Sequence, residues 1–226
     1  MNYRFLLFTI LISFITVVFY KATHAFFTSN QIISGNTITT VSLSPAPTIS
    51  LTSTPSPTPI PVSPGDVVIN EIMWQGSDDE WIELRNTTGN SIDISQWTIE
   101  NAGSGSNSIQ IPPSTTLPAG GLYLIAENKN MSTINVDPDQ TTASVSLLDT
   151  GEVLMLKTST SQTIDTAFTG VGWFLSSSSP RKTVERNSTP GDGTQAANWQ
   201  TATTHTGMDG SGSTDEFGTP KNTNGL

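Results

Sequence analysis

The chain has 226 residues, no cysteine and a formal net charge of −10 at pH 7. The lack of cysteine excludes disulfide bonds and thiolate metal sites. From Asp66 onward there are seven Lys or Arg residues against all nineteen Asp or Glu residues. This acidic balance disfavours nucleic acid as a partner, because such binding depends on Lys and Arg contacts to phosphate.

The first 25 residues have the layout of an export signal. Arg4 precedes an apolar run from Phe5 to Tyr20, and small residues follow up to Ala25. A basic start, an apolar middle and a small-residue end are typical of a cleaved secretory signal peptide. Extended to Phe27, the run also suits an uncleaved apolar helix that anchors the chain in a membrane through residues 5–27. Both interpretations predict export of the remaining chain to the cell surface or beyond.

Residues 26–65 predict a disordered linker. They contain no charged residue and become rich in proline towards the end, in SPAPTISLTSTPSPTPIPVSPG. Closely spaced prolines neither pair in a sheet nor continue a helix, so they favour extended polyproline II. A Pro/Ser/Thr-rich segment of this kind is expected to hold a folded domain away from a membrane or cell wall.

Residues 66–226 predict an all-β domain. Short apolar segments alternate with clusters of Gly, Asn, Asp and Ser, a pattern typical of strands joined by tight turns. No ten-residue stretch shows the apolar stripe of an amphipathic helix. The predicted strands are Val67–Trp74, Glu80–Asn86, Ile92–Ile94, Trp97–Glu100, Ser108–Ile111, Leu122–Ala126, Glu152–Lys157 and Thr163–Phe168.

Alternation assigns individual side chains to the two faces of these strands. Ile82 and Leu84 are expected to point into the core, opposite Glu83 and Arg85. The apolar run Val153–Leu156 predicts a strand that is covered on both faces. Tryptophans are expected in the core and at its edges, because each buries a large apolar area. They are Trp74, Trp81 and Trp97.

Several motifs resemble the lamin-tail domain in their order and spacing. They are NEI at 70–72, DEWIEL at 79–84, DISQW at 93–97, LPAGGLYLIA at 117–126 and the segment 147–168. The segments 183–187, 198–199 and 218–222 resemble the closing elements of the bacterial secreted or surface form. The resemblance covers nearly all of Asp66 to Asn222. The usual ending has a glycine after the proline, where this chain has Lys221.

The resemblance implies an immunoglobulin-like β-sandwich and a module that tethers or displays without enzymatic activity. It also implies that Glu71, Glu80 and Glu83 belong to the structural pattern of the domain. These carboxylates are expected to bond backbone amides or to pair with an arginine. Filament assembly is not implied, since the chain lacks coiled-coil segments.

A calcium site is the cofactor hypothesis that the sequence raises. Asp78, Asp79 and Glu80 place three carboxylates together, and Ca²⁺ prefers such oxygen ligands. A second acidic loop contains Asp137 and Asp139.

The stretch 209–220 begins like an EF-hand loop but does not satisfy that motif. Its sixth position is Thr214, where glycine is required, and its twelfth is Pro220, where a bidentate glutamate belongs.

The sequence shows no catalytic set. His205 is the one histidine beyond residue 25, and it is expected to be solvated in a loop without a nucleophile elbow. Asp78–Glu80 leaves open a glycosidase-type carboxylate pair. The basic residues Arg181, Lys182 and Arg186 could contact an anionic polymer or DNA. We favour ion pairs with neighbouring acids for them.

The sequence therefore predicts an exported, surface-tethered, non-catalytic module for binding, display or envelope attachment. Its partner would be a protein, a glycan or an envelope polymer, and the membrane would be contacted through an uncleaved N-terminal segment. One alternative is a secreted hydrolase that acts on a cell-wall or glycan substrate through acidic residues. Another is a structural spacer that self-assembles through its edge strands.

Overall fold

The computed structural model describes residues 61–75, 80–103, 107–128, 134–175, 177–178, 180–208 and 216–225. They all lie in the second of the two units into which the chain divides, Ser56–Leu226. The predicted signal or anchor and most of the predicted linker lie outside these residues. Within the described ranges, no helix has the length and apolar character needed to cross a membrane.

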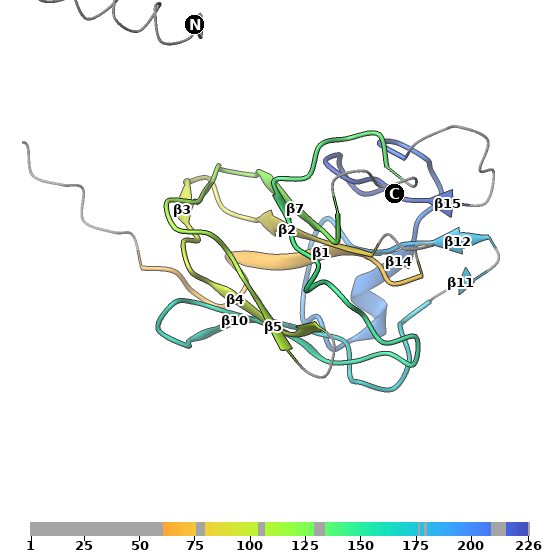
Figure 1. The fold of residues 1–226 in the computed structure, drawn as a ribbon, viewed down its shortest axis with the longest axis horizontal. Coiled ribbons are helices and arrows are strands. Elements are labelled where there is room, and N and C mark those ends of the chain that lie inside the picture. The colour runs from red at the N-terminus through yellow and green to blue at the C-terminus, as the bar shows by residue number, and fades with distance from the viewer. Residues whose placement is uncertain are drawn as a thin grey trace, which may run out of the picture. The chain divides into compact units, whose positions relative to one another are not determined.

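The largest sheet has six strands in the order β14-β13-β1-β2-β7-β8. Of these strands, Figure 1 labels β1, β2, β7 and β14. Neighbouring strands are antiparallel, except that β7 and β8 are parallel. A 3₁₀ helix, Ala196–Asn198, leads directly into the edge strand β14. The strands are β1 (Val67–Met73), β2 (Trp81–Asn86), β7 (Leu122–Ala126), β8 (Gln140–Thr141), β13 (Val184–Arg186) and β14 (Trp199–Thr201).

A second sheet has four strands in the order β10-β9-β4-β5. They are β4 (Thr98–Gly103), β5 (Asn107–Gln110), β9 (Leu154–Lys157) and β10 (Thr163–Ala167). Two smaller sheets complete the described part of the chain. One pairs β3 (Ile92–Asp93) with β6 (Thr116–Leu117), and the other contains β11 (Ser177–Ser178), β12 (Arg181–Lys182) and β15 (Glu216–Phe217).

The prediction of an all-β domain is confirmed for the described residues, which contain no α-helix. Each of the eight predicted strands has a counterpart in the structure. The pattern did not predict β6, β8 and the five strands from β11 to β15. Each of these is only two or three residues long, too short to show alternation.

The two larger sheets share one apolar core. Ile82 and Leu84 of the six-stranded sheet are fully buried in it, together with Ile99 and Leu156 of the four-stranded sheet. The predicted inward direction of Ile82 and Leu84 is therefore confirmed. In β9, buried and partly exposed residues alternate. The prediction that this strand is covered on both faces is wrong, because only one face of its sheet meets the core.

Aromatic side chains fill one part of this core around Phe168. Its ring stacks on Trp199 with centroids 4.4 Å apart and meets Trp173 edge-on at 4.9 Å. Trp173 in turn stacks with Trp74. The predicted burial of the tryptophans is confirmed for Trp74, Trp81 and Trp97.

Trp81 belongs to a second apolar cluster on the opposite face of the six-stranded sheet. There it packs with Met73 and Leu124 beneath Ile134 and Met208, which come from loops. This sheet is therefore covered on both faces, whereas the alternation in its sequence predicts one buried face and one solvent-exposed face.

A β-bulge at Asn70 sets the faces of β1. Ile69 pairs with Leu84 in register, whereas Glu71 pairs with Glu83, so Asn70 is the additional residue. Strict alternation would place Glu71 on the same face as Ile69, in the apolar core. The bulge instead puts Asn70 and Glu71 together on the opposite face.

Truncation of the central aromatic side chain should destabilise the domain strongly. We expect Phe168→Ala to lower the free energy of unfolding by about 3–5 kcal/mol, because it removes the ring between two tryptophans. Urea unfolding followed by tryptophan fluorescence measures this change. Val171→Ser is a suitable control, because Val171 is 85% exposed and should shift stability by less than about 0.5 kcal/mol. Equal losses in the two variants would contradict this account of the core.

Candidate functional site

Three glutamates lie side by side on the outer face of the six-stranded sheet. Glu71 on β1 is in register with Glu83 on β2 and with Glu185 on β13. All three side chains are completely buried. Like charges on directly opposed strand positions destabilise a sheet. This glutamate row therefore needs hydrogen-bond donors from elsewhere in the chain.

The C-terminal strap, residues Glu216–Gly225, provides a main-chain donor to each of these glutamates. The N–H of Thr219 donates to Glu71 at 2.8 Å, that of Lys221 to Glu83 at 2.6 Å, and that of Gly225 to Glu185 at 3.1 Å. These contacts confirm, for Glu71 and Glu83, the prediction that the carboxylates bond backbone amides. They also explain why Glu83 is buried, although alternation places it away from the core.

Side chains complete the hydrogen bonding of the glutamate row. The Thr183 hydroxyl donates to Glu71 at 2.6 Å. Asn70, at the bulge, donates through Nδ2 to Glu83 and to Asn224, both at 2.9 Å. Asn224 then donates to the main-chain carbonyl of Arg186 at 2.7 Å. The strap is thereby tied to three strands of the sheet.

The close approach of the strap depends on a glycine. A Cβ atom at Gly218 would lie 2.9 Å from both Met208 Sδ and Thr183 Cγ2, and 3.1 Å from Glu71 Oε1. Any larger residue at this position would push the strap away from the glutamate row.

At position 221 the chain has a lysine where the usual ending of the domain has a glycine, and the contacts of this lysine account for the difference. Its φ of 61° lies in the left-handed region, which favours glycine. The lysine is nevertheless anchored, because its Nζ donates to both carboxylate oxygens of Asp139 at 2.6 Å. The acidic loop that contains Asp137 and Asp139 is thus joined to the strap by an ion pair.

Burial raises the pKa of every glutamate in the row. It raises the pKa of Glu71 well above its ordinary value, and the nearby charges of Glu83 and Glu185 raise it further. Burial raises the pKa of Glu83 to about 7, although hydrogen bonds from Lys221 and Asn70 act in the opposite direction. Burial also raises the pKa of Glu185.

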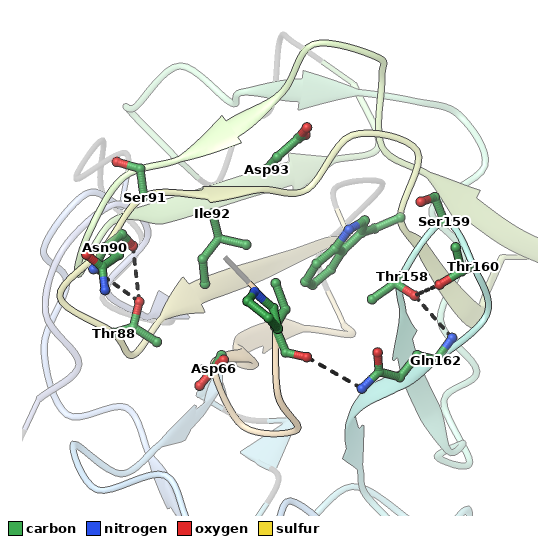
Figure 2. Close-up of a pocket in the computed structure, with 13 residues that line it drawn as sticks. Asp66, Thr88, Asn90, Ser91, Ile92, Asp93, Thr158, Ser159, Thr160 and Gln162 are labelled. Carbon is green, nitrogen blue, oxygen red and sulfur yellow. Dashed lines mark hydrogen bonds between the residues drawn. The ribbon is translucent and has the colours of Figure 1, made fainter. Parts of the chain in front are cut away.

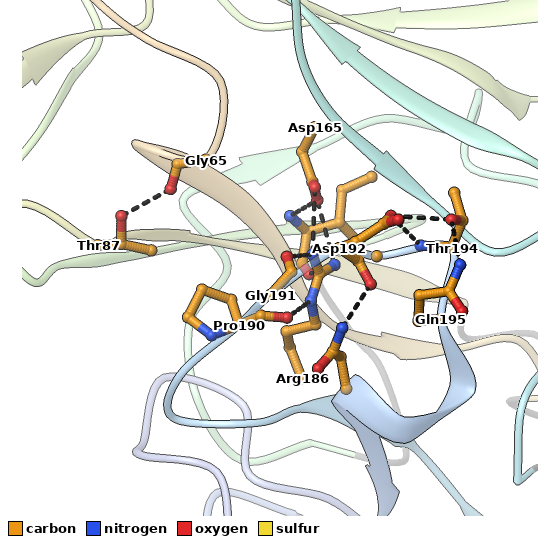
Figure 3. A network of polar contacts seen from close by, with 12 residues as sticks. Gly65, Thr87, Asp165, Arg186, Pro190, Gly191, Asp192, Thr194 and Gln195 are labelled. Carbon is orange, nitrogen blue, oxygen red and sulfur yellow. Dashed lines mark hydrogen bonds and ion pairs between the residues drawn. The ribbon is translucent and has the colours of Figure 1, made fainter.

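A second polar centre joins the two larger sheets (Figure 3). Arg186, on β13, binds both carboxylate oxygens of Asp165, on β10, at 3.2 and 3.3 Å. Its remaining donors reach the carbonyls of Pro190 at 2.7 Å and Gly191 at 2.8 Å. Asp165 also accepts a hydrogen bond from the Ile69 N–H at 2.9 Å. Burial raises the pKa of Asp165, whereas the charge of Arg186 lowers it.

The residues of the predicted basic cluster are separated in the structure. Arg181 pairs with Glu216 at 3.0 Å, and Lys182 lies over the ring of Phe217 at 4.4 Å. Arg186 is completely buried with Asp165. The favoured prediction of ion pairs with neighbouring acids is confirmed for both arginines. The three residues do not form a shared basic surface, because Arg186 is inaccessible.

The calcium candidates are only partly within the described residues. Asp78 and Asp79 lie outside them, as do residues 209–215. Glu80 Oε2 accepts a hydrogen bond from the Leu147 N–H at 2.5 Å, as the structural interpretation of this glutamate predicts. Burial raises the pKa of Glu80 to about 7. Among the described residues, no three His, Asp or Glu side chains converge as metal ligands.

His205 is exposed, as predicted for a loop histidine. Its Nδ1 lies 2.6 Å from the main-chain carbonyl of Glu216, and its ring centroid lies 4.0 Å from that of Phe217. The imidazole is therefore engaged with β15, next to the start of the strap.

A pocket of about 710 Å³ opens at the end of the domain where the chain enters β1 (Figure 2). Three segments that are distant in sequence form it: the entry segment before β1, the loop after β2 together with β3, and the β9–β10 turn. Alternation did not reveal this site, because turns carry no strand period. The lining residues are Pro61, Val62, Asp66, Thr88, Asn90, Ser91, Ile92, Asp93, Trp97, Thr158, Ser159, Thr160 and Gln162.

Internal hydrogen bonds shape the walls of this loop-end pocket. The Gln162 N–H donates to Thr158 Oγ1 at 3.1 Å, and the hydroxyls of Thr158 and Thr160 are 3.0 Å apart. On the facing wall, the Thr88 hydroxyl donates to the side chain of Asn86 at 2.8 Å. Asp66 caps the entry segment by accepting the Ser63 N–H at 2.7 Å.

Part of the domain matches a known family. Residues 61–170 match the family model of the Lamin Tail Domain. The match includes strands β1 to β10 and ends before β13, β14 and the strap. Residues 171–222, which the sequence resemblance also included, lie outside it. A search of curated proteins gives no match to the chain.

The glutamate row should make the domain less stable as pH rises through the neutral range. Unfolded glutamates ionise near pH 4.5, whereas Glu83 in the folded domain keeps its proton up to about pH 7. Between these values the unfolded state binds fewer protons, so increasing pH favours unfolding. We expect unfolding free energy to fall by on the order of 3 kcal/mol from pH 5 to pH 8.

Chemical denaturation across this pH range measures the effect. Glu83→Gln should reduce the slope of the curve, because the amide cannot ionise, and the raised pKa values of Glu71 and Glu80 should account for the slope that remains. Asp137→Asn, at an exposed loop position, should leave it unchanged. Stability that rises from pH 5 to pH 8 would contradict the prediction.

Breaking the pair between the sheets should be far more costly than breaking an exposed pair. Arg186→Leu leaves Asp165 buried without its cation, and we expect a loss of about 3–5 kcal/mol in unfolding free energy. Lys157→Leu removes a pair with Glu100 in which both side chains are partly exposed, and it should cost less than about 1 kcal/mol. Urea unfolding of the two variants gives the comparison, and similar losses would show that Arg186 has no special role.

Proposed function

We propose that the protein is an exported, surface-tethered lamin tail module of the bacterial secreted type, which binds or displays without catalysis. The N-terminal apolar run and the Pro/Ser/Thr-rich segment support export and tethering, since they directly precede the region that matches the Lamin Tail Domain. The finer fold in this proposal is an immunoglobulin-like sandwich. Its support is the single core that the six-stranded and four-stranded sheets share.

The observation that carries the non-catalytic role is the use of the buried carboxylates as structural acceptors. A hydrolase needs carboxyl groups that reach a substrate within a cleft. Here Glu71, Glu83 and Glu185 each accept a main-chain N–H of the strap, which covers them. Their raised pKa values arise from burial in the scaffold, so they do not mark a general acid.

Binding at the end of the domain agrees with the position of the loop-end pocket. Pro61 and Val62 belong both to its wall and to the last residues of the proline-rich segment. In the proposed arrangement, the segment that tethers the domain leads directly to its binding site. Loops on a rigid β-scaffold are common positions for such sites.

Export is tested by recovery of the full chain from bacterial cells, followed by fractionation and intact-mass measurement. We expect the protein outside the cytosol, starting at Phe26 if the signal is cleaved or at Met1 in the membrane fraction if it anchors the chain. A control variant with Leu11→Arg and Val17→Arg interrupts the apolar run and should stay in the cytosol. Cytosolic protein with an intact Met1 would overturn the proposal.

A further inference from the structure

We propose that the loop-end pocket binds a neutral oligosaccharide. This inference rests on the proposed binding function and names the class of ligand for it. It does not depend on whether the N-terminal segment is cleaved.

The size and construction of the pocket suit a small preformed site. Its volume of about 710 Å³ lies within the ~300–1,000 Å³ that is usual for small-molecule pockets. Two main-chain hydrogen bonds close the β9–β10 turn. The Thr158 N–H donates to the carbonyl of Gln162, and the Ser161 N–H donates to the carbonyl of Thr158, both at 2.9 Å. Two hydrogen bonds hold the entry segment in place. Asp66 accepts the Ser63 N–H, and the Gly65 N–H donates to the carbonyl of Ile164 at 2.8 Å. Walls that are ordered in advance reduce the entropic cost of binding.

The polar groups of the pocket match sugar hydroxyls. The side chains of Asn90, Ser91 and Ser159 line it, and none of them has a hydrogen-bond partner within the described residues. The first two lie on the wall opposite the β9–β10 turn (Figure 2). Amide and hydroxyl groups both donate and accept hydrogen bonds, as sugar hydroxyls do. Gln162 adds an amide whose Nε2 makes only a long contact of 3.5 Å to Val62.

The charge of the pocket disfavours anionic ligands. Asp66 and Asp93 line it, and neither Lys nor Arg is among its lining residues. Hydrogen bonds from Ser95 lower the pKa of Asp93, so this carboxylate is ionised at neutral pH. Uronate, phosphate and sulfate groups would be repelled, whereas a carboxylate accepts a strong hydrogen bond from a neutral hydroxyl. The remaining Asp66 oxygen, Oδ1, has no partner within the described residues.

Apolar groups complete the site. Ile92 and Trp97 line the pocket, each with less than a tenth of its surface exposed. Pro61 and Val62 also line the pocket, and their side chains are exposed and partly exposed, respectively. The C–H groups of a sugar ring can pack against these apolar side chains while its hydroxyls bond the polar wall. This combination favours a saccharide over a ligand that is polar throughout.

Titration of the full chain with neutral tetrasaccharides tests the proposal. Cellotetraose, chitotetraose, maltotetraose and mannotetraose present different hydroxyl arrangements, and calorimetry with tryptophan fluorescence follows binding. We expect at least one to bind with a Kd of about 1 mM or tighter. A variant with Asn90→Ala and Ser159→Ala, one from each wall, should weaken binding about tenfold.

The matched control is Gln195→Ala with Thr203→Ala, which removes exposed polar groups outside the pocket and should leave the Kd unchanged. Unchanged thermal midpoints establish that all variants are folded. Failure of all four tetrasaccharides to bind at about 10 mM would overturn the proposal. Tighter binding of tetralysine or tetragalacturonate would also overturn it, since the site would then select charge. Export is measured separately by fractionation, so the two proposals can fail independently.

Discussion

The structure depends on hydrogen bonds between three buried glutamates and the end of the chain. Glu71, Glu83 and Glu185 are cross-strand neighbours, and among the described residues none of them forms an ion pair. Buried carboxyl groups without donors are costly. The N–H groups of the C-terminal strap meet that need, so the strap is an integral part of the fold. The strap, part of which the sequence resemblance places among the closing elements of the domain, covers the glutamate row on the outer face of the sheet.

The buried ion pair between Asp165 and Arg186 joins the two larger sheets. Its geometry is bidentate, and further carbonyls satisfy the guanidinium, as a buried pair requires. Gly193 is needed beside it, because a Cβ atom there would collide with the Arg186 guanidinium and the carbonyl of Thr166. Together, the pair and the glutamate row include most of the buried acidic and basic side chains, and both stabilise the fold. The loop-end pocket is left with exposed amides, hydroxyls and two aspartates for recognition.

Much of the architecture could be predicted from residue patterns. Eight strands, all but β3 at least four residues long, follow from alternation and turn clusters, and the burial of the tryptophans follows from their size. The structural roles of Glu71, Glu80 and Glu83 followed from the family resemblance. The glutamate row itself could not be predicted, because it requires the bulge at Asn70 and the register of β13. The pocket was also missed, since it combines three loops whose proximity is set by the packing of the sheets.

The sequence by itself determined the all-β class, the strand-rich core and the lamin tail motifs, because alternation and turn residues act locally. Only the tertiary structure decided which polar residues are buried and which remain free. Glu83 and Arg186 look like surface residues in the chain, yet both are enclosed by segments far away in sequence. Asn90 and Ser159 are ordinary loop residues until the packing of the strands places them around one pocket. Long-range contacts decide burial and proximity, and these contacts leave no periodic trace in a single sequence.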